Sequence, residues 1–123
     1  MDVSGAERSA RSWGSPVGND HVRVEVTHGD RSSTVVVHGE VDVASAGVLE
    51  AAIDAVRDGR CREVVVDLGG VSFIDLAGLR VLHLAATDGL GVVVRNPSRL
   101  ARRVIGLAGM ADALPIEGDH EVG

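Results

Sequence analysis

Hydrophobic and polar residues alternate strictly where the patterned part of the chain begins. Valines at 22, 24 and 26 alternate with polar residues at 23, 25 and 27, and this two-residue period predicts a strand that is buried on one face. Residues 28–30, His-Gly-Asp, favour a turn, and residues 33–38 then predict the returning strand of a hairpin. Residues 39–42, Gly-Glu-Val-Asp, are expected to lead out of the sheet.

Three later segments, 44–58, 75–87 and 97–108, carry the 3.6-residue period of amphipathic helices. Asp75 stands at the N-cap of the second segment, and Gly109 stands at the C-terminal cap of the third. Pro97 is expected in the first turn of the third helix. The residues predicted to face inward are Leu49, Ala52, Ile53 and Val56 in the first helix, Gly78, Leu79, Leu82, Ala85 and Ala86 in the second, and Leu100, Val104 and Leu107 in the third.

Between the helices lie two short runs with three consecutive valines each, 63–68 and 91–95. The first run is typical of a central strand covered on both faces, and the second predicts another strand. Gly69-Gly70 predicts a turn after the first run, and residues 114–116, Leu-Pro-Ile, predict a short edge strand, where proline is tolerated. The predicted order is β-β-α-β-α-β-α-β, an α/β domain with a single mixed, mostly parallel sheet. We expect one domain over residues 21–116, between a flexible N-terminal tail at 1–20 and a C-terminal tail at 117–123.

Composition narrows the function classes. Hydrophobic residues make up 45% and charged residues 24% of 123 residues, which indicates a globular chain. A net charge of -6 and an aromatic content of 2% argue against nucleic-acid binding. The single cysteine, Cys61, has no partner for an internal disulfide, and no signal-peptide core or run of about 18 apolar residues is present. These features predict a cytoplasmic protein that does not insert directly into a membrane.

The sequence offers little for catalysis. It contains no phosphate-binding G-x-x-x-x-G-K motif, and its five histidines are not spaced as metal ligands. We therefore expect no enzyme activity, no catalytic residue, no metal and no cofactor.

Three segments resemble a known family in order and spacing: VVVDLGGVSFIDLAGL at 64–79, HGEVD at 38–42 and NPSRLARRVIGLAGM at 96–110. They are similar to the STAS domain, and within it to the anti-sigma factor antagonists of bacteria. The resemblance covers about residues 21–116 and implies the STAS fold. It also implies a partner, an anti-sigma factor that is an ATPase-type serine kinase. In that family the unphosphorylated antagonist binds the kinase and frees the sigma factor, and phosphorylation of a serine ends the binding.

The resemblance assigns candidate site residues, with one departure from the family pattern. Asp75 matches the family aspartate at the start of the second helix, and Asp42 matches an acidic residue in a loop that borders the same surface. Position 76, where the family has its phosphoacceptor serine, is Leu76, so no phosphoacceptor is expected there. Ser72 is the remaining candidate acceptor, although bonding within a turn is its more ordinary role. The expected partner-binding residues are Asp42, Asp75, Leu76, Ala77, Gly78 and Arg80.

These observations favour an anti-sigma factor antagonist that acts by protein–protein docking, lacks the phosphorylation switch and regulates sigma-factor-dependent transcription. The alternative is a STAS accessory subunit that regulates a transporter or lipid-transport ATPase. A small-molecule sensor and a phosphotransfer enzyme are less favoured, because the chain lacks a phosphate cradle and the acceptor serine. We expect a monomer or a weak homodimer, with the exposed edge of the hairpin as one site of dimerisation.

Overall fold

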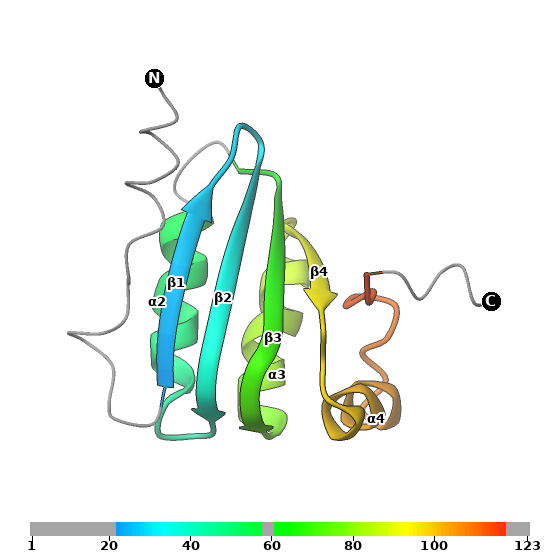
Figure 1. The fold of residues 1–123 in the computed structure, drawn as a ribbon. Helices are drawn as coiled ribbons and strands as arrows, with labels where there is room; N and C mark the ends of the chain where they lie inside the picture. Colours follow the sequence, from blue (N-terminus) through cyan, green and yellow to red (C-terminus); the bar gives the residue numbers. More distant parts are fainter. Residues whose placement is uncertain (1–21, 58–60, 118–123) are drawn as a thin grey trace.

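The computed structural model describes residues 22–57 and 61–117, which form four strands and three helices (Figure 1). The predicted tail at 1–20, position 21, the end of the first predicted helix at Asp58 and residues 118–123 lie outside the described residues. The elements are β1 (Val22–His28), β2 (Ser32–Val41), α2 (Ala46–Arg57), β3 (Glu63–Ile74), α3 (Leu76–Thr87), β4 (Gly91–Arg95) and α4 (Arg99–Leu107).

The strands form one sheet in the order β1-β2-β3-β4. β1 and β2 pair antiparallel as the predicted hairpin, with Val24 opposite Val37. β2 pairs with β3, and β3 with β4, in parallel. The α/β class and the mixed, mostly parallel sheet are therefore confirmed.

The last predicted strand, at 114–116, is reduced to a single bridge between Ile116 and Val94. The backbone N–H of Val94 donates to the carbonyl of Pro115 (2.9 Å), and the N–H of Glu117 donates to the carbonyl of Val94 (2.8 Å). Arg95 Nε also donates to Glu117 Oε1 at 2.7 Å, and this hydrogen bond holds the pKa of Glu117 below its ordinary value. This segment is thus fixed to β4 by a few bonds.

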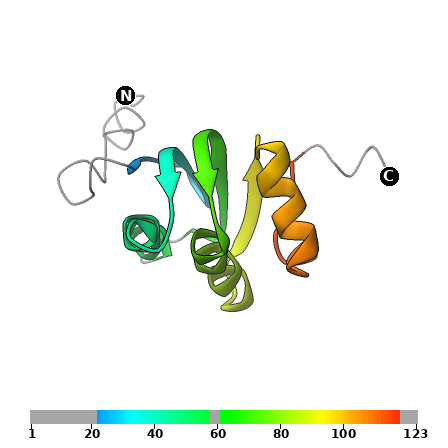
Figure 2. The same cartoon turned by 90° about the horizontal axis from the view of Figure 1, so that it is seen from below.

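The core lies between the sheet and the helices that cover one of its faces. Seen end-on to the strands, Figure 2 shows α2 and α3 on the same face, with α4 beside β4. The inward faces predicted for α2 and α3 are confirmed, since all nine residues are buried except Ala86, which is half-buried. The prediction that β3 is covered on both faces is wrong, because no helix of the described residues covers the second face of the sheet. Val64 and Val66 are fully buried beneath the helices, whereas Val65 and Val93 are half-buried on the other side.

The inward face predicted for α4 is wrong for two of its three residues, since only Val104 is half-buried and packs against the core. Ala101 and Ile105 are the buried residues of this helix, whereas Leu100 is 55% and Leu107 is 80% exposed. Because α4 lies at the edge of the sheet, only part of its apolar surface packs against the sheet, and the rest stays exposed. The helix begins after Ser98, whose Oγ accepts from the N–H of Ala101 (3.0 Å). Pro97, which was expected in the first turn, therefore lies before the helix.

β2 and β3 extend further than predicted. Residues 39–41 do not leave the sheet but pair with 71, 73 and 74, and Gly69-Gly70 lies within β3 rather than in a turn. The register shifts twice along this pairing, between Val36 and His38 and between Gly39 and Glu40. At Gly70 a Cβ atom would lie 2.5 Å from His38 Nδ1, so glycine leaves room for the imidazole ring. The two strands therefore end side by side.

No helix in the described part of the chain is both long and apolar enough to cross a membrane.

Candidate functional site

The candidate site lies where β2 and β3 end, at the lower end of the sheet in Figure 1. Val41 pairs with Ile74 as the last residues of the two strands. The backbone N–H of Asp75 donates to the carbonyl of Val41 (3.1 Å), which holds the start of α3 beside the loop after β2. The structure thus brings together Asp42 and Asp75, the two acidic residues that the sequence singled out. Loops at the carboxyl ends of parallel strands are a usual place for function in α/β sheets.

Asp42 organises the loop that leads into α2. Its Oδ1 accepts from the N–H groups of Ala44 (3.0 Å) and Ser45 (3.1 Å). The buried hydroxyl of Ser45 lies 3.0 Å from the same oxygen and 2.9 Å from the carbonyl of Glu40. Because Asp42 Oδ1 bonds to several groups of the loop, Asp42 fixes the conformation of this part of the surface.

Asp75 caps α3, as predicted. Its Oδ1 accepts from the backbone N–H of Ala77 (2.9 Å) and of Gly78 (3.4 Å), which satisfies two N–H groups that the first turn of a helix leaves unpaired. Ile74 and Leu79, on either side of the cap, are both buried, as expected for a hydrophobic staple. The cap and the staple together set the position of residue 76.

Gly78 lies behind the surface rather than on it. It is buried, and a Cβ atom there would lie 2.6 Å from Val41 Cγ1 and 2.9 Å from Ile74 Cγ1. Its missing side chain lets the first turn of α3 pack closely on the ends of β2 and β3. Ala77 is half-buried, so these two predicted residues shape the surface from below.

Leu76, by contrast, projects from the first position of α3 and is 49% exposed. Val43 in the loop after β2 is 79% exposed, and Phe73 near the end of β3 is 43% exposed. We call Val43, Phe73 and Leu76 the apolar edge. Arg80, one turn further along α3, is also exposed. The sequence reasoning missed Val43 and Phe73, although both lie within two residues of a strand end, where burial is incomplete.

Ser72 lies in β3 and not in the loop in which the sequence placed it. The residue is exposed, and its Oγ is 3.4 Å from the carbonyl oxygen of Gly39 on β2. Its hydroxyl is therefore accessible from solvent, but it stands on a paired strand rather than at the start of a helix.

Among residues 22–57 and 61–117, no three side chains of His, Cys, Asp or Glu gather as a metal site would require. The groups at the site are backbone amides, two carboxylates, a guanidinium and exposed apolar side chains. Such a set fits recognition of a protein surface.

The comparisons with known proteins agree with this architecture. The family model described as "Mlab, STAS domain" matches residues 24–116. A mixed sheet with helices on one face, and a capped helix beside the loop after β2, define the fold class. The chain belongs to the STAS domain family.

Several relatives carry more specific names. The chain is 33% identical over 96 residues to the anti-sigma-F factor antagonist RsfB of Mycobacterium tuberculosis, a match that covers 74% of this chain and 77% of RsfB. The crystal structure of an anti-sigma factor antagonist from Mycobacterium paratuberculosis is similar with a TM-score of 0.70 and 32% identity, over 80% of this chain and 87% of that one. The phosphorylated Bacillus protein SpoIIAA shares the fold, with a TM-score of 0.58 and 20% identity over 80% of this chain and 95% of its own.

Proposed function

We propose that the protein is an anti-sigma factor antagonist that binds an ATPase-type anti-sigma factor through the apolar edge and the residues around it. Relatives at 32–33% identity over about three quarters of the chain or more are named anti-sigma factor antagonists. The observation that carries the proposal is the exposure of Leu76, half of whose surface is open at the first position of a capped helix. The protein acts by binding and not by catalysis, in the bacterial cytoplasm where sigma factors function.

The apolar edge is suited to this role. Three large apolar side chains lie exposed at one end of the sheet, flanked by Asp42 and Arg80. Apolar residues that are buried on association contribute about 25 cal/mol for each Å² removed from water. Charged residues at the rim add orientation and partner choice more than affinity.

The proposed antagonist has no phosphorylation switch at position 76. A leucine side chain has no hydroxyl, so a serine kinase has no acceptor there. A phosphate at this position would add a charge of about −1.5 to −2, which is compatible with a helix N-terminus but disruptive in a protein interface. The surface therefore stays competent for binding when the kinase is active. Ser72 remains the alternative acceptor, because its hydroxyl is exposed.

The test uses the purified full chain and the ATPase-type anti-sigma factors of the same organism. Isothermal titration calorimetry should detect binding by the wild type. Leu76→Glu should weaken it by about tenfold or more, because a charge would be buried without a partner. Leu107→Glu is the matched control, since it places the same charge at an exposed leucine of α4 and should leave this affinity unchanged. Binding that is equal for all three proteins would refute the proposed surface.

Mass spectrometry after incubation of the complex with ATP tests the missing switch. The mass of the antagonist should not change. A gain of one phosphate, removed by Ser72→Ala, would show that the acceptor is Ser72 and would overturn the switchless mechanism. Binding to a transporter ATPase, with none to any anti-sigma factor, would instead support the alternative function as an accessory subunit.

A further inference from the structure

The outer side of α4 carries a feature that the proposed function does not use. Leu100 and Leu107 are exposed, and Arg99 and Arg103 lie beside them, one helical turn apart and both exposed. We call these four residues the α4 stripe. α4 contains three arginines and no acidic residue, in a chain whose net charge is -6. Neither Arg99 nor Arg103 forms an ion pair with any of the described residues. An apolar ridge edged with the cations Arg99 and Arg103 is thus exposed on α4.

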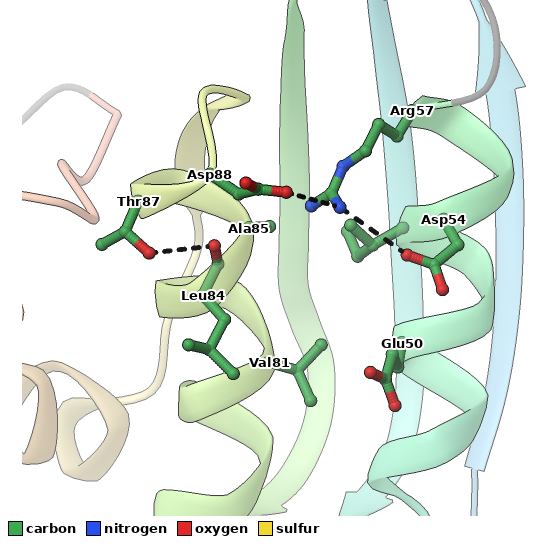
Figure 3. A pocket seen from close by; sticks show the side chains of 9 residues that line it. Glu50, Asp54, Arg57, Val81, Leu84, Ala85, Thr87 and Asp88 are labelled. Carbon is green, nitrogen blue, oxygen red and sulfur yellow. Dashed lines mark hydrogen bonds and ion pairs between the residues drawn. The ribbon is translucent and has the colours of Figure 1, made fainter.

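A groove of complementary character lies between α2 and α3 (Figure 3). Its volume is about 310 Å³, and its floor is apolar. Leu84, on the α3 side, is 56% exposed. The apolar lining residues are Ile53, Val81, Leu84 and Ala85.

The α2 wall of this groove is acidic. Glu50 and Asp54 lie on it one helical turn apart, and both are exposed. At the end of the groove, Arg57 Nη1 lies 3.1 Å from Asp88 Oδ2 and 4.0 Å from Asp54 Oδ1. Arg57 is therefore engaged mainly with Asp88, and Glu50 forms no ion pair with the described residues.

We propose that the α4 stripe of one copy of this chain docks in the α2/α3 groove of a second copy. Both charged pairs are four residues apart on a helix, a rise of about 6 Å. Arg99 and Arg103 of one copy can therefore face Glu50 and Asp54 of the other at the same time. In this arrangement the two leucines of the stripe lie on the apolar floor.

A second copy fits this pair of surfaces better than the same copy or a lipid surface. Within one copy, α4 lies on the far side of α3 from the groove (Figure 2), so the stripe cannot fill the groove of its own chain. An anionic membrane would attract the arginines but would be repelled by a chain of net charge -6. It would also leave the acidic groove without a partner.

The contact is small, so the association is weak. One short helix in an open groove buries less than a standard interface of about 1,600 Å². We expect a dissociation constant of about 0.1–1 mM. Because the matched charges are exposed, the affinity should fall as salt is raised. The stripe and the groove contain none of the residues of the apolar edge, so this inference stands or falls separately from the proposed function.

Charge reversal provides the test, with sedimentation of the full chain at concentrations up to about 1 mM as the measurement. The double variant Arg99→Glu/Arg103→Glu and the double variant Glu50→Arg/Asp54→Arg should each remain monomeric. An equimolar mixture of the two should associate again, because each variant supplies the surface that the other has lost. Leu76→Glu is the control and should associate like the wild type. All four reversed positions are exposed, so circular dichroism should show the wild-type fold.

Three results would overturn the proposal. The first is a wild type that stays monomeric at the highest concentration. The second is a dimer that both double variants retain, which would place the contact elsewhere, such as the edge of β1. The third is a monomer that binds anionic vesicles through Arg99 and Arg103, which would assign the stripe to lipid. If a double variant misfolds, Leu107→Ser replaces it and should likewise abolish association.

Discussion

Replacing Gly78 by alanine tests how α3 is held on the ends of β2 and β3. A Cβ atom at this position would lie 2.6 Å from Val41 Cγ1 and 2.9 Å from Ile74 Cγ1. The preferred separation of two carbon atoms is about 3.5–4.0 Å, so the overlap approaches 1 Å. Val41 and Ile74 are 0% and 3% exposed, and side chains packed so tightly have little room to yield. Overpacking of this kind costs about 1–3 kcal/mol of folding free energy.

Gly47 offers a matched control for this substitution. It lies in the first turn of α2, as Gly78 lies in the first turn of α3, but a Cβ atom there meets nothing within 4 Å. Both changes to alanine gain helix propensity, at most about 1 kcal/mol. The difference between them therefore isolates the steric cost.

Urea unfolding followed by far-ultraviolet circular dichroism measures both variants. We expect Gly47→Ala to be equal to the wild type or slightly more stable, and Gly78→Ala to be about 1–3 kcal/mol less stable than Gly47→Ala. The slope of the free energy against urea should not change, because the same surface is exposed on unfolding. Equal stability of the two variants would show that the first turn of α3 is not packed as tightly as the structure indicates.

Two further predictions concern polar contacts. Asp75→Ala removes the N-cap of α3 and should lower the free energy of unfolding by about 1 kcal/mol. Asp75→Asn keeps a capping oxygen and should lose much less stability. An equal loss in both variants would mean that capping is not the role of Asp75. The Arg95 hydrogen bond lowers the pKa of Glu117, so its stabilising effect is present above the ordinary carboxyl pKa and is lost as the pH falls through the lowered value. Wild type should therefore be more stable than Glu117→Gln at neutral pH, and in acid unfolding experiments the difference should vanish once the pH lies below the lowered pKa of Glu117. A constant difference at every pH would contradict this.

The sequence contained enough information for the elements whose burial follows from local periodicity. In α2 and α3 the buried positions recur at the spacing of one helix face, so the face that packs on the sheet could be predicted from the spacing. The N-cap at Asp75 is also local, because its carboxylate bonds to amides two and three residues away. The position and exposure of Leu76 followed from these two features.

The register and the length of the β2–β3 pairing, by contrast, could not be predicted from the sequence. Glycine pairs read as turns when they are considered alone, but Gly69 and Gly70 remain in β3 because β2 continues beside them and Gly70 accommodates the His38 ring. The same extension keeps 39–41 in the sheet and places Phe73 at the apolar edge. A residue's neighbours across a sheet depend on register, which no local pattern specifies.

The orientation of α4 shows the same division between local and tertiary information. Its periodicity predicted an amphipathic helix with Leu100, Val104 and Leu107 facing inward. Tertiary packing decided that Ala101 and Ile105 face the core and that Leu100 and Leu107 remain exposed. A helix at the edge of a sheet buries only the part of its surface that meets the neighbouring strand, and where that strand lies is determined by the rest of the fold.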